Sequence, residues 1–142
     1  MSDRRRFCAA TASWQLAQTL WVGGLWLLHF VVVPSLERVG LAPLLVEEIT
    51  RSLTPLLVAF TAFCALVQGF VLVQIEGVRS LQRDSRGQLL VAVLVMAVAF
   101  LLVNQLQPNA MRWLAFNYLV LAFCGALLVI QPVPVGEKVR AR

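Results

Sequence analysis

The sequence predicts an all-α membrane protein in which four transmembrane helices pack as an antiparallel bundle. Four long apolar runs, polar or proline-containing segments between them, and unevenly distributed basic residues support this fold class. Of the 142 residues, 60% are hydrophobic and 13% are charged, whereas soluble domains are about 45 to 50% apolar and about 25% charged. A soluble fold of this size could not bury so much apolar surface. We therefore expect residues 1–142 to form a single membrane domain, with the lipid bilayer as its main partner.

The first apolar run extends from about residue 12 to residue 33. At about 1.5 Å per residue, it is long enough to cross a hydrocarbon core of about 30 Å. We expect Pro34 and Ser35 to end this helix. The three arginines before the run resemble the basic start of a signal peptide, but the run exceeds the usual apolar length and no small-residue cleavage site follows it. The sequence therefore predicts an uncleaved signal anchor.

Residues 36–52 mix charged and apolar side chains, which predicts an amphipathic segment lying along the membrane surface. Thr54 is a favoured N-cap residue and Pro55 a favoured first-turn residue, so we expect the second membrane helix to cover residues 55–75. In an alternative interpretation, one helix starts near Pro43 and continues through Pro55 with a kink.

A polar connector, residues 76–88, precedes the third apolar run at about residues 89–106. A tight turn containing a proline then leads to the fourth run, at about residues 113–130, which Pro132 and its neighbours end. These runs are continuously apolar for about twice the length of a membrane β-strand, so they predict helices and not a β-barrel.

The basic residues predict that both termini are cytoplasmic, because cytoplasmic segments of membrane proteins carry an excess of lysine and arginine. Nine basic residues lie on one predicted side: Arg4, Arg5, Arg6, Arg79, Arg83, Arg86, Lys138, Arg140 and Arg142. Three lie on the other: Arg38, Arg51 and Arg112. We expect a multi-pass protein of the cell inner membrane. The net charge of +5 is spread over several clusters and not along one stripe, so we expect no nucleic-acid partner.

His29 is the only histidine, and it lies inside the first predicted helix. An ionisable residue within a membrane span is a candidate functional residue. On a helical wheel of about 100° per residue, Gln15, Gln18, Val22 and Leu25 share one stripe with His29. We expect this polar stripe to face the other helices.

Polar residues of the other helices are expected at matching depths. Asn104 and Asn117 belong to the layer of His29, and Gln68 to the layer of the two glutamines in the first helix. The structural interpretation is interhelical hydrogen bonding. The functional alternative makes His29 a haem or copper ligand or a proton-relay group, with a second His29 supplied by a homo-oligomer.

Gly23 and Gly24 lie in the middle of the first predicted helix, where missing side chains let a neighbouring backbone approach closely. We expect these glycines to serve helix packing. The sequence contains no nucleophile paired with a base, no phosphate-binding loop and no metal-ligand spacing. We therefore expect no catalytic residue, no metal-binding motif and no enzymatic activity.

Residues 19–26 read Thr-Leu-Trp-Val-Gly-Gly-Leu-Trp, and residues 32–36 read Val-Val-Pro-Ser-Leu. This pattern resembles the opening signature of the transmembrane protein 205-like family, also called domain of unknown function 4149. The resemblance covers about residues 16–36 and implies a small four-helix membrane protein, without implying a biochemical activity. The third connector is shorter than the family's pattern. Small copper-resistance membrane proteins have a comparable pattern, in keeping with the metal hypothesis for His29.

Three functional hypotheses follow from these observations. The first is a non-catalytic integral membrane protein that acts through helix packing and association, with itself or with a membrane complex. The second is a haem- or copper-binding or transporting unit centred on His29. The third is an oligomeric transporter of a small solute, in which the pathway lies between subunits because four helices alone leave little room for a pore.

Overall fold

The structure, a computed structural model, describes residues 2–107 and 109–132, and almost all of these residues are helical. The elements in chain order are α1 (Ser2–Leu27), the π-helix η1 (Leu28–Val32), α2 (Val33–Arg38), α3 (Pro43–Glu76), α4 (Ser80–Arg83), α5 (Ser85–Leu106) and α6 (Met111–Ile130). No strand occurs among the described residues. The predicted all-α class is confirmed.

Four helical stretches are long and apolar enough to cross a membrane, so the protein is a multi-pass membrane protein. The first, Arg4–Arg38, runs continuously from α1 through η1 to α2 over 35 residues, and α3 spans 34. The third and fourth, α5 and α6, have 22 and 20 residues, or about 33 and 30 Å at 1.5 Å per residue. The first two reach about 50 Å, so they extend beyond a hydrocarbon core of about 30 Å.

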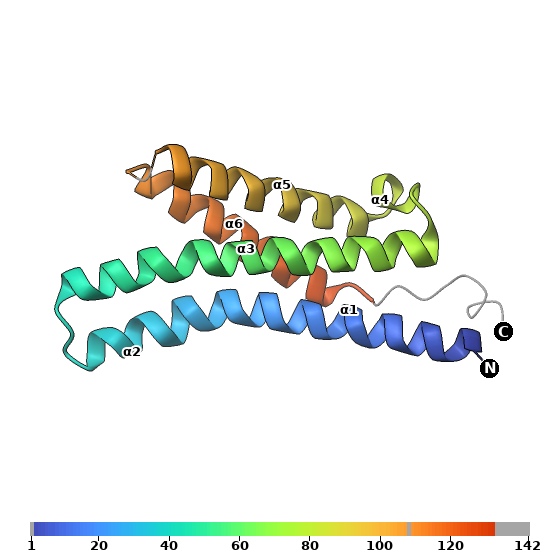
Figure 1. Ribbon diagram of the computed structural model, residues 1–142, viewed down its shortest axis with the longest axis horizontal. Helices are drawn as coiled ribbons and strands as arrows, with labels where there is room; N and C mark the ends of the chain where they lie inside the picture. The colour runs from blue at the N-terminus through green and yellow to red at the C-terminus, as the bar shows by residue number, and fades with distance from the viewer. Residues whose placement is uncertain (1, 108, 133–142) are drawn as a thin grey trace.

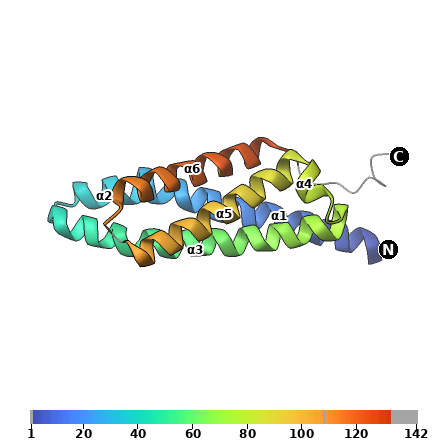
Figure 2. The same ribbon diagram turned by 90° about the horizontal axis from the view of Figure 1, so that it is seen from above.

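The four long helices alternate in direction (Figures 1 and 2). Helix α3 packs against α1 and α5, α5 packs against α6, and α6 also contacts α1. The chain's N-terminus and α4 lie at one end of the bundle, which we call the proximal end. The α2–α3 and α5–α6 connections lie at the opposite, distal end, where the α1–α3 pair extends further than the α5–α6 pair. The predicted antiparallel bundle is therefore present.

The expected end of the first span at Pro34 and Ser35 is wrong. The helix continues through both residues and ends at Arg38. A proline lacks an N–H group, and in an α-helix its ring clashes with the carbonyl four residues earlier. The π-helical turn of η1, in which the Val33 N–H donates to the Leu28 carbonyl, widens the helix just before the proline. This turn lets the chain pass Pro34 without ending the helix.

The expected surface segment at residues 36–52 is also wrong as a separate element. Helix α3 begins at Pro43 and runs through Pro55, as the alternative interpretation predicted. Thr54 is not an N-cap, because its hydroxyl donates to the Thr50 carbonyl one turn earlier at 2.6 Å. Buried valines lie both before and after Pro55 on this helix. Packing on both sides therefore outweighs the one backbone hydrogen bond that the proline removes.

The third and fourth spans end as predicted, at residues 106 and 130. Each starts earlier than expected, at residue 85 instead of 89 and at residue 111 instead of 113. Gly77, which ends α3, has a φ of 84°. Only glycine adopts this conformation without steric cost, so a sharp turn toward α4 follows.

The core lies along the centre of the bundle, where Trp21, Leu25, Leu72, Leu90 and Leu121 are fully buried. Many other large apolar side chains are exposed on the outward faces of the helices. An exposed apolar surface of this extent is what a membrane-embedded bundle presents to lipid.

Helix α6 approaches α1 at Gly125. A Cβ atom at this position would lie 2.9 Å from the Trp21 ring and 2.9 Å from the Val22 side chain, so only glycine permits this approach. In the predicted glycine pair, a Cβ on Gly24 would meet Leu57 at 3.4 Å, whereas a Cβ on Gly23 would meet nothing within 4 Å. Within this chain, close packing thus involves Gly24 and not Gly23.

Candidate functional site

Gln68 is the centre of the polar contact between α1 and α3. Its side-chain oxygen accepts a hydrogen bond from the Trp21 indole N–H at 3.0 Å, and its amide nitrogen donates to the Trp14 carbonyl at 3.2 Å. The sequence placed Gln68 in a layer with Gln15 and Gln18. Its partners are instead the Trp21 indole N–H and the Trp14 backbone carbonyl. The tryptophans of the first helix could have suggested the first contact, because a buried indole N–H usually has a hydrogen-bond acceptor.

The polar stripe predicted for the first helix is only partly directed toward the bundle. Gln18, Val22 and Leu25 are buried, but Gln15 and His29 are exposed. At the distal end His29 lines an open groove, which accounts for its exposure. Leu28 takes the buried position that the wheel assigned to His29.

The His29 ring lies beside two aromatic rings. Its centroid is 5.3 Å from that of Phe30, with the planes nearly perpendicular, and 6.2 Å from that of Tyr118 on α6. The Tyr118 hydroxyl donates to the Leu25 carbonyl at 2.5 Å and so links α6 to α1. Tyr118 was not singled out from the sequence, although it is the only tyrosine and lies within a membrane span.

Asn104 and Asn117, the other members of the predicted outer layer, have different environments. Asn104 is half-buried near the end of α5 and lines the same groove as His29. Asn117 is fully buried, and among the described residues neither its amide nitrogen nor its oxygen has a hydrogen-bond partner. Shared depth along the helices therefore does not bring these residues into one hydrogen-bonded layer.

A groove of about 800 Å³ lies at the distal end between η1 and α2, the start of α3, and α6. We call it the distal groove. Its volume lies within the range of about 300 to 1,000 Å³ that is typical of small-molecule sites. Six of its polar or ionisable lining residues are His29, Glu37, Glu47, Arg51, Asn104 and Tyr118.

The distal groove changes in character along the bundle axis. Its charged residues, Glu37, Glu47 and Arg51, come from the α2–α3 part that extends furthest at the distal end (Figure 1). Deeper in the bundle, Trp26 on α1 and Phe123 on α6 line it. The groove is therefore charged at one end and aromatic at the other.

Two aromatic side chains that line the distal groove, one on η1 and one on α6, are exposed. Phe30 on η1 is 62% exposed, and Phe123 on α6 is 61% exposed. Because both side chains also line the groove, its mouth lies between η1 and α6 on the side surface of the bundle. In a membrane this surface faces lipid.

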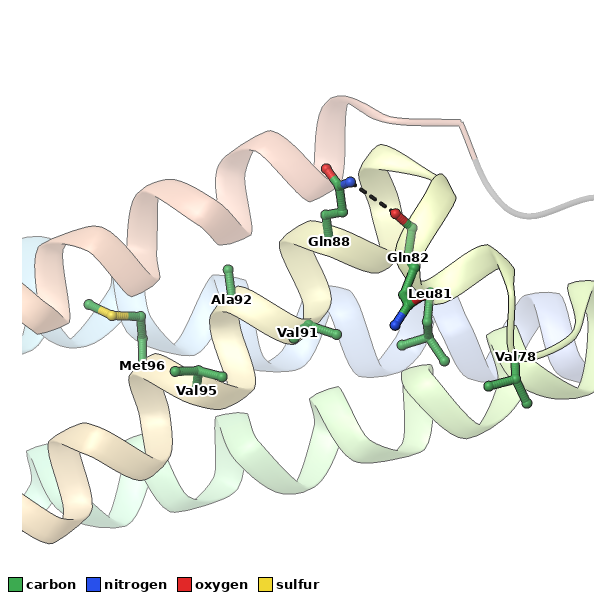
Figure 3. Close-up of a pocket in the computed structure, with 8 residues that line it drawn as sticks. All are labelled: Val78, Leu81, Gln82, Gln88, Val91, Ala92, Val95 and Met96. Carbon is green, nitrogen blue, oxygen red and sulfur yellow. Dashed lines mark hydrogen bonds between the residues drawn. The ribbon is translucent and has the colours of Figure 1, made fainter.

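A second hollow, of about 660 Å³, lies at the proximal end between the α3–α4 connection, α4 and α5 (Figure 3). Figure 3 shows Val91, Val95 and Met96 on the α5 wall, with Gln88 donating to the Gln82 carbonyl at 3.0 Å. Its lining is almost entirely apolar and contains no ionisable residue. The distal groove is therefore the better candidate for a specific site.

Metal or cofactor binding by one chain would depend on His29. In the part of the chain that the structure describes, no three His, Cys, Asp or Glu side chains are grouped so that they could hold a metal ion. The His29 imidazole lines the distal groove, where it could supply one ligand to haem or copper. No family model, curated protein or solved structure matches this chain, so the groove's own chemistry must indicate a function.

Proposed function

We propose that this protein is a non-catalytic inner-membrane protein that acts by association, binding an amphiphilic molecule of the bilayer in the distal groove. The main support is the lining of the groove. It is aromatic at membrane depth and charged where the α1–α3 pair extends beyond the α5–α6 pair. Pockets with an apolar lining and a few placed polar groups are typical binding sites. The proposal also includes association with a second copy or with a membrane complex.

The side opening of the groove indicates how a ligand would arrive. Phe30 and Phe123 lie at the mouth and are exposed on the lipid-facing surface. A molecule dissolved in the bilayer can therefore slide between η1 and α6 without crossing water. This route favours an amphiphile over a water-soluble solute. The alternative of oligomeric transport would require a water-soluble solute.

The proposed orientation places the proximal end in the cytoplasm. Six arginines lie in α1, α4, α5 or the connection before α4, on the proximal side: Arg4, Arg5, Arg6, Arg79, Arg83 and Arg86. Three lie on the distal side: Arg38, Arg51 and Arg112. The excess of basic residues supports a cytoplasmic proximal end. Lys138, Arg140 and Arg142, which also entered the prediction, lie outside the described residues.

Membership of the transmembrane protein 205-like family is part of the same proposal. It is supported by the Trp-Val-Gly-Gly pattern at residues 21–24 and by Pro34. The four-helix architecture agrees with that resemblance.

Lipid retention tests the proposed function. Protein extracted in mild detergent and measured by native mass spectrometry is expected to carry one lipid-sized ligand per chain. Ala115 lines the groove on α6 and is exposed, so Ala115→Trp should fill the groove and remove the ligand. Ala59→Trp, at an exposed alanine of α3 outside the groove, is the matched control and should retain it. Equal retention by both variants, or a ligand-free parent protein, would contradict the proposal.

Haem or copper binding is a second candidate, favoured by the position of the His29 ring in the groove wall. In a symmetric homo-oligomer, His29 of another copy would supply a second ligand. Gentle purification should then give a Soret band or stoichiometric copper, lost in His29→Ala. Colourless, copper-free parent protein would remove this candidate.

A further inference from the structure

The length of the distal groove matches one leaflet of a bilayer. Along the first span, Glu37 and Trp26 mark its charged and aromatic ends, about 16 Å apart at 1.5 Å per residue. Along α6, Met111 and Phe123 line it over about 18 Å. A leaflet contributes about 15 Å of the hydrocarbon core. The groove can therefore hold one lipid parallel to the helices, with its headgroup at the distal end.

The charged end of the groove contains both signs. Glu37 on α2 and Glu47 on α3 supply two carboxylates, and Arg51 supplies a guanidinium one turn after Glu47. A guanidinium binds phosphate through directed hydrogen bonds, and carboxylates accept hydrogen bonds from an ammonium group.

We propose that the distal groove binds a phospholipid of the distal leaflet whose headgroup carries a primary ammonium, as phosphatidylethanolamine does. This inference rests on the proposed function and names its ligand. The phosphate faces Arg51, and the ammonium lies between Glu37 and Glu47. A headgroup that carries a phosphate and no amine would bring a third negative charge to a site where Arg51 is the one cation of the three charged lining residues named above. A quaternary ammonium lacks the N–H donors that the carboxylates can accept.

The remaining walls fit the other parts of such a lipid. His29 and Asn104 line the groove between its charged and aromatic ends, and both side chains can donate hydrogen bonds to ester carbonyls. The Trp26 and Phe30 rings are stacked, with centroids 5.2 Å apart and planes 10° from parallel. Both rings line the groove and supply apolar surface for an acyl chain.

The test compares lipids that share acyl chains and differ in headgroup. Delipidated full-length protein is titrated with phosphatidylethanolamine, phosphatidylcholine or phosphatidylglycerol, and binding is followed by native mass spectrometry. We expect phosphatidylethanolamine to bind about tenfold more tightly than the other two, equivalent to about 1.4 kcal/mol. The double variant Glu37→Gln, Glu47→Gln should lose this preference while still binding lipid. Both positions are exposed, so the fold should tolerate the change.

Glu48→Gln is the matched control, because Glu48 is exposed on α3 beside Glu47 and does not line the groove. It should keep the preference. Equal binding of all three lipids, or a preference that survives the double variant, would overturn the headgroup inference and leave the proposed function standing. Absence of binding by any lipid would overturn both.

Discussion

Gln68 shows how one buried polar side chain can hold two membrane helices together. Both ends of its amide are used, one by the Trp21 indole and one by the Trp14 backbone. An unpaired polar group within an apolar core is costly, so both partners depend on the glutamine.

Gln68→Leu should therefore destabilise the protein by about 1 to 3 kcal/mol, because it leaves the buried Trp21 N–H without an acceptor. Denaturation in detergent, followed by tryptophan fluorescence, measures the change. Gln74→Leu, at an exposed position of the same helix, should have little effect. Equal stabilities for the two variants would show that the hydrogen bonds of Gln68 contribute nothing measurable.

Asn117 presents the opposite case, since it is fully buried and neither amide atom has a partner. Replacing it with an apolar side chain removes the cost of burying these groups. Asn117→Leu should therefore raise the stability by about 1 to 3 kcal/mol in the same denaturation experiment. A clear loss of stability would mean that the amide makes a favourable contact in the membrane.

At the scale of the element, the contact between α1 and α6 depends on one glycine. A Cβ on Gly125 would lie 2.9 Å from the rigid Trp21 ring, so Gly125→Ala must push the helices apart. We expect a loss of about 1 to 3 kcal/mol, as for other overpacked cores. Gly23→Ala is the matched control, because its Cβ would meet nothing within 4 Å. It should be neutral or slightly stabilising, and a larger loss in Gly23→Ala than in Gly125→Ala would contradict this packing.

His29 lies within the π-helical turn of η1, so we expect the geometry of this turn to affect the direction of its side chain. Pro34→Ala restores an N–H group and removes the ring that clashes in a regular α-helix, so the turn should return to α-helical geometry and bring position 29 toward the bundle. With His29→Cys as a probe and the native cysteines replaced, the rate of thiol labelling should fall when Pro34→Ala is added. An unchanged rate would show that another feature maintains η1.

The sequence predicted most of the fold because apolar run length depends on bilayer thickness and little on neighbouring helices. The predicted helix end at Pro34 and helix start at Pro55 were wrong, because a proline in the sequence indicates only the local cost to the backbone. A π turn offsets that cost at Pro34, and buried valines outweigh it at Pro55. The site was harder to predict, because a regular helical wheel assumed one helix geometry through residue 29, whereas residues 28–32 form a π-helical turn. The groove itself depends on the tertiary packing of all four long helical stretches.

At the scale of the whole molecule, unequal helix lengths create the candidate site. The α1–α3 pair extends beyond the α5–α6 pair at the distal end (Figures 1 and 2), and the groove lies in the corner between them. Its charged residues belong to the longer pair. The orientation of the bundle therefore decides which leaflet supplies a ligand, and the proposed orientation selects the outer leaflet.

Cysteine accessibility in intact cells tests this central claim most directly. Single cysteines at Ala42 and Asn109 report on the distal end, and those at Arg5 and Arg79 on the proximal end, all at exposed positions. With the native cysteines replaced, a membrane-impermeant maleimide should label Ala42→Cys and Asn109→Cys in intact cells. Arg5→Cys and Arg79→Cys should react only after lysis. Labelling of the proximal pair in intact cells, or different behaviour within either pair, would contradict four spans with a cytoplasmic proximal end.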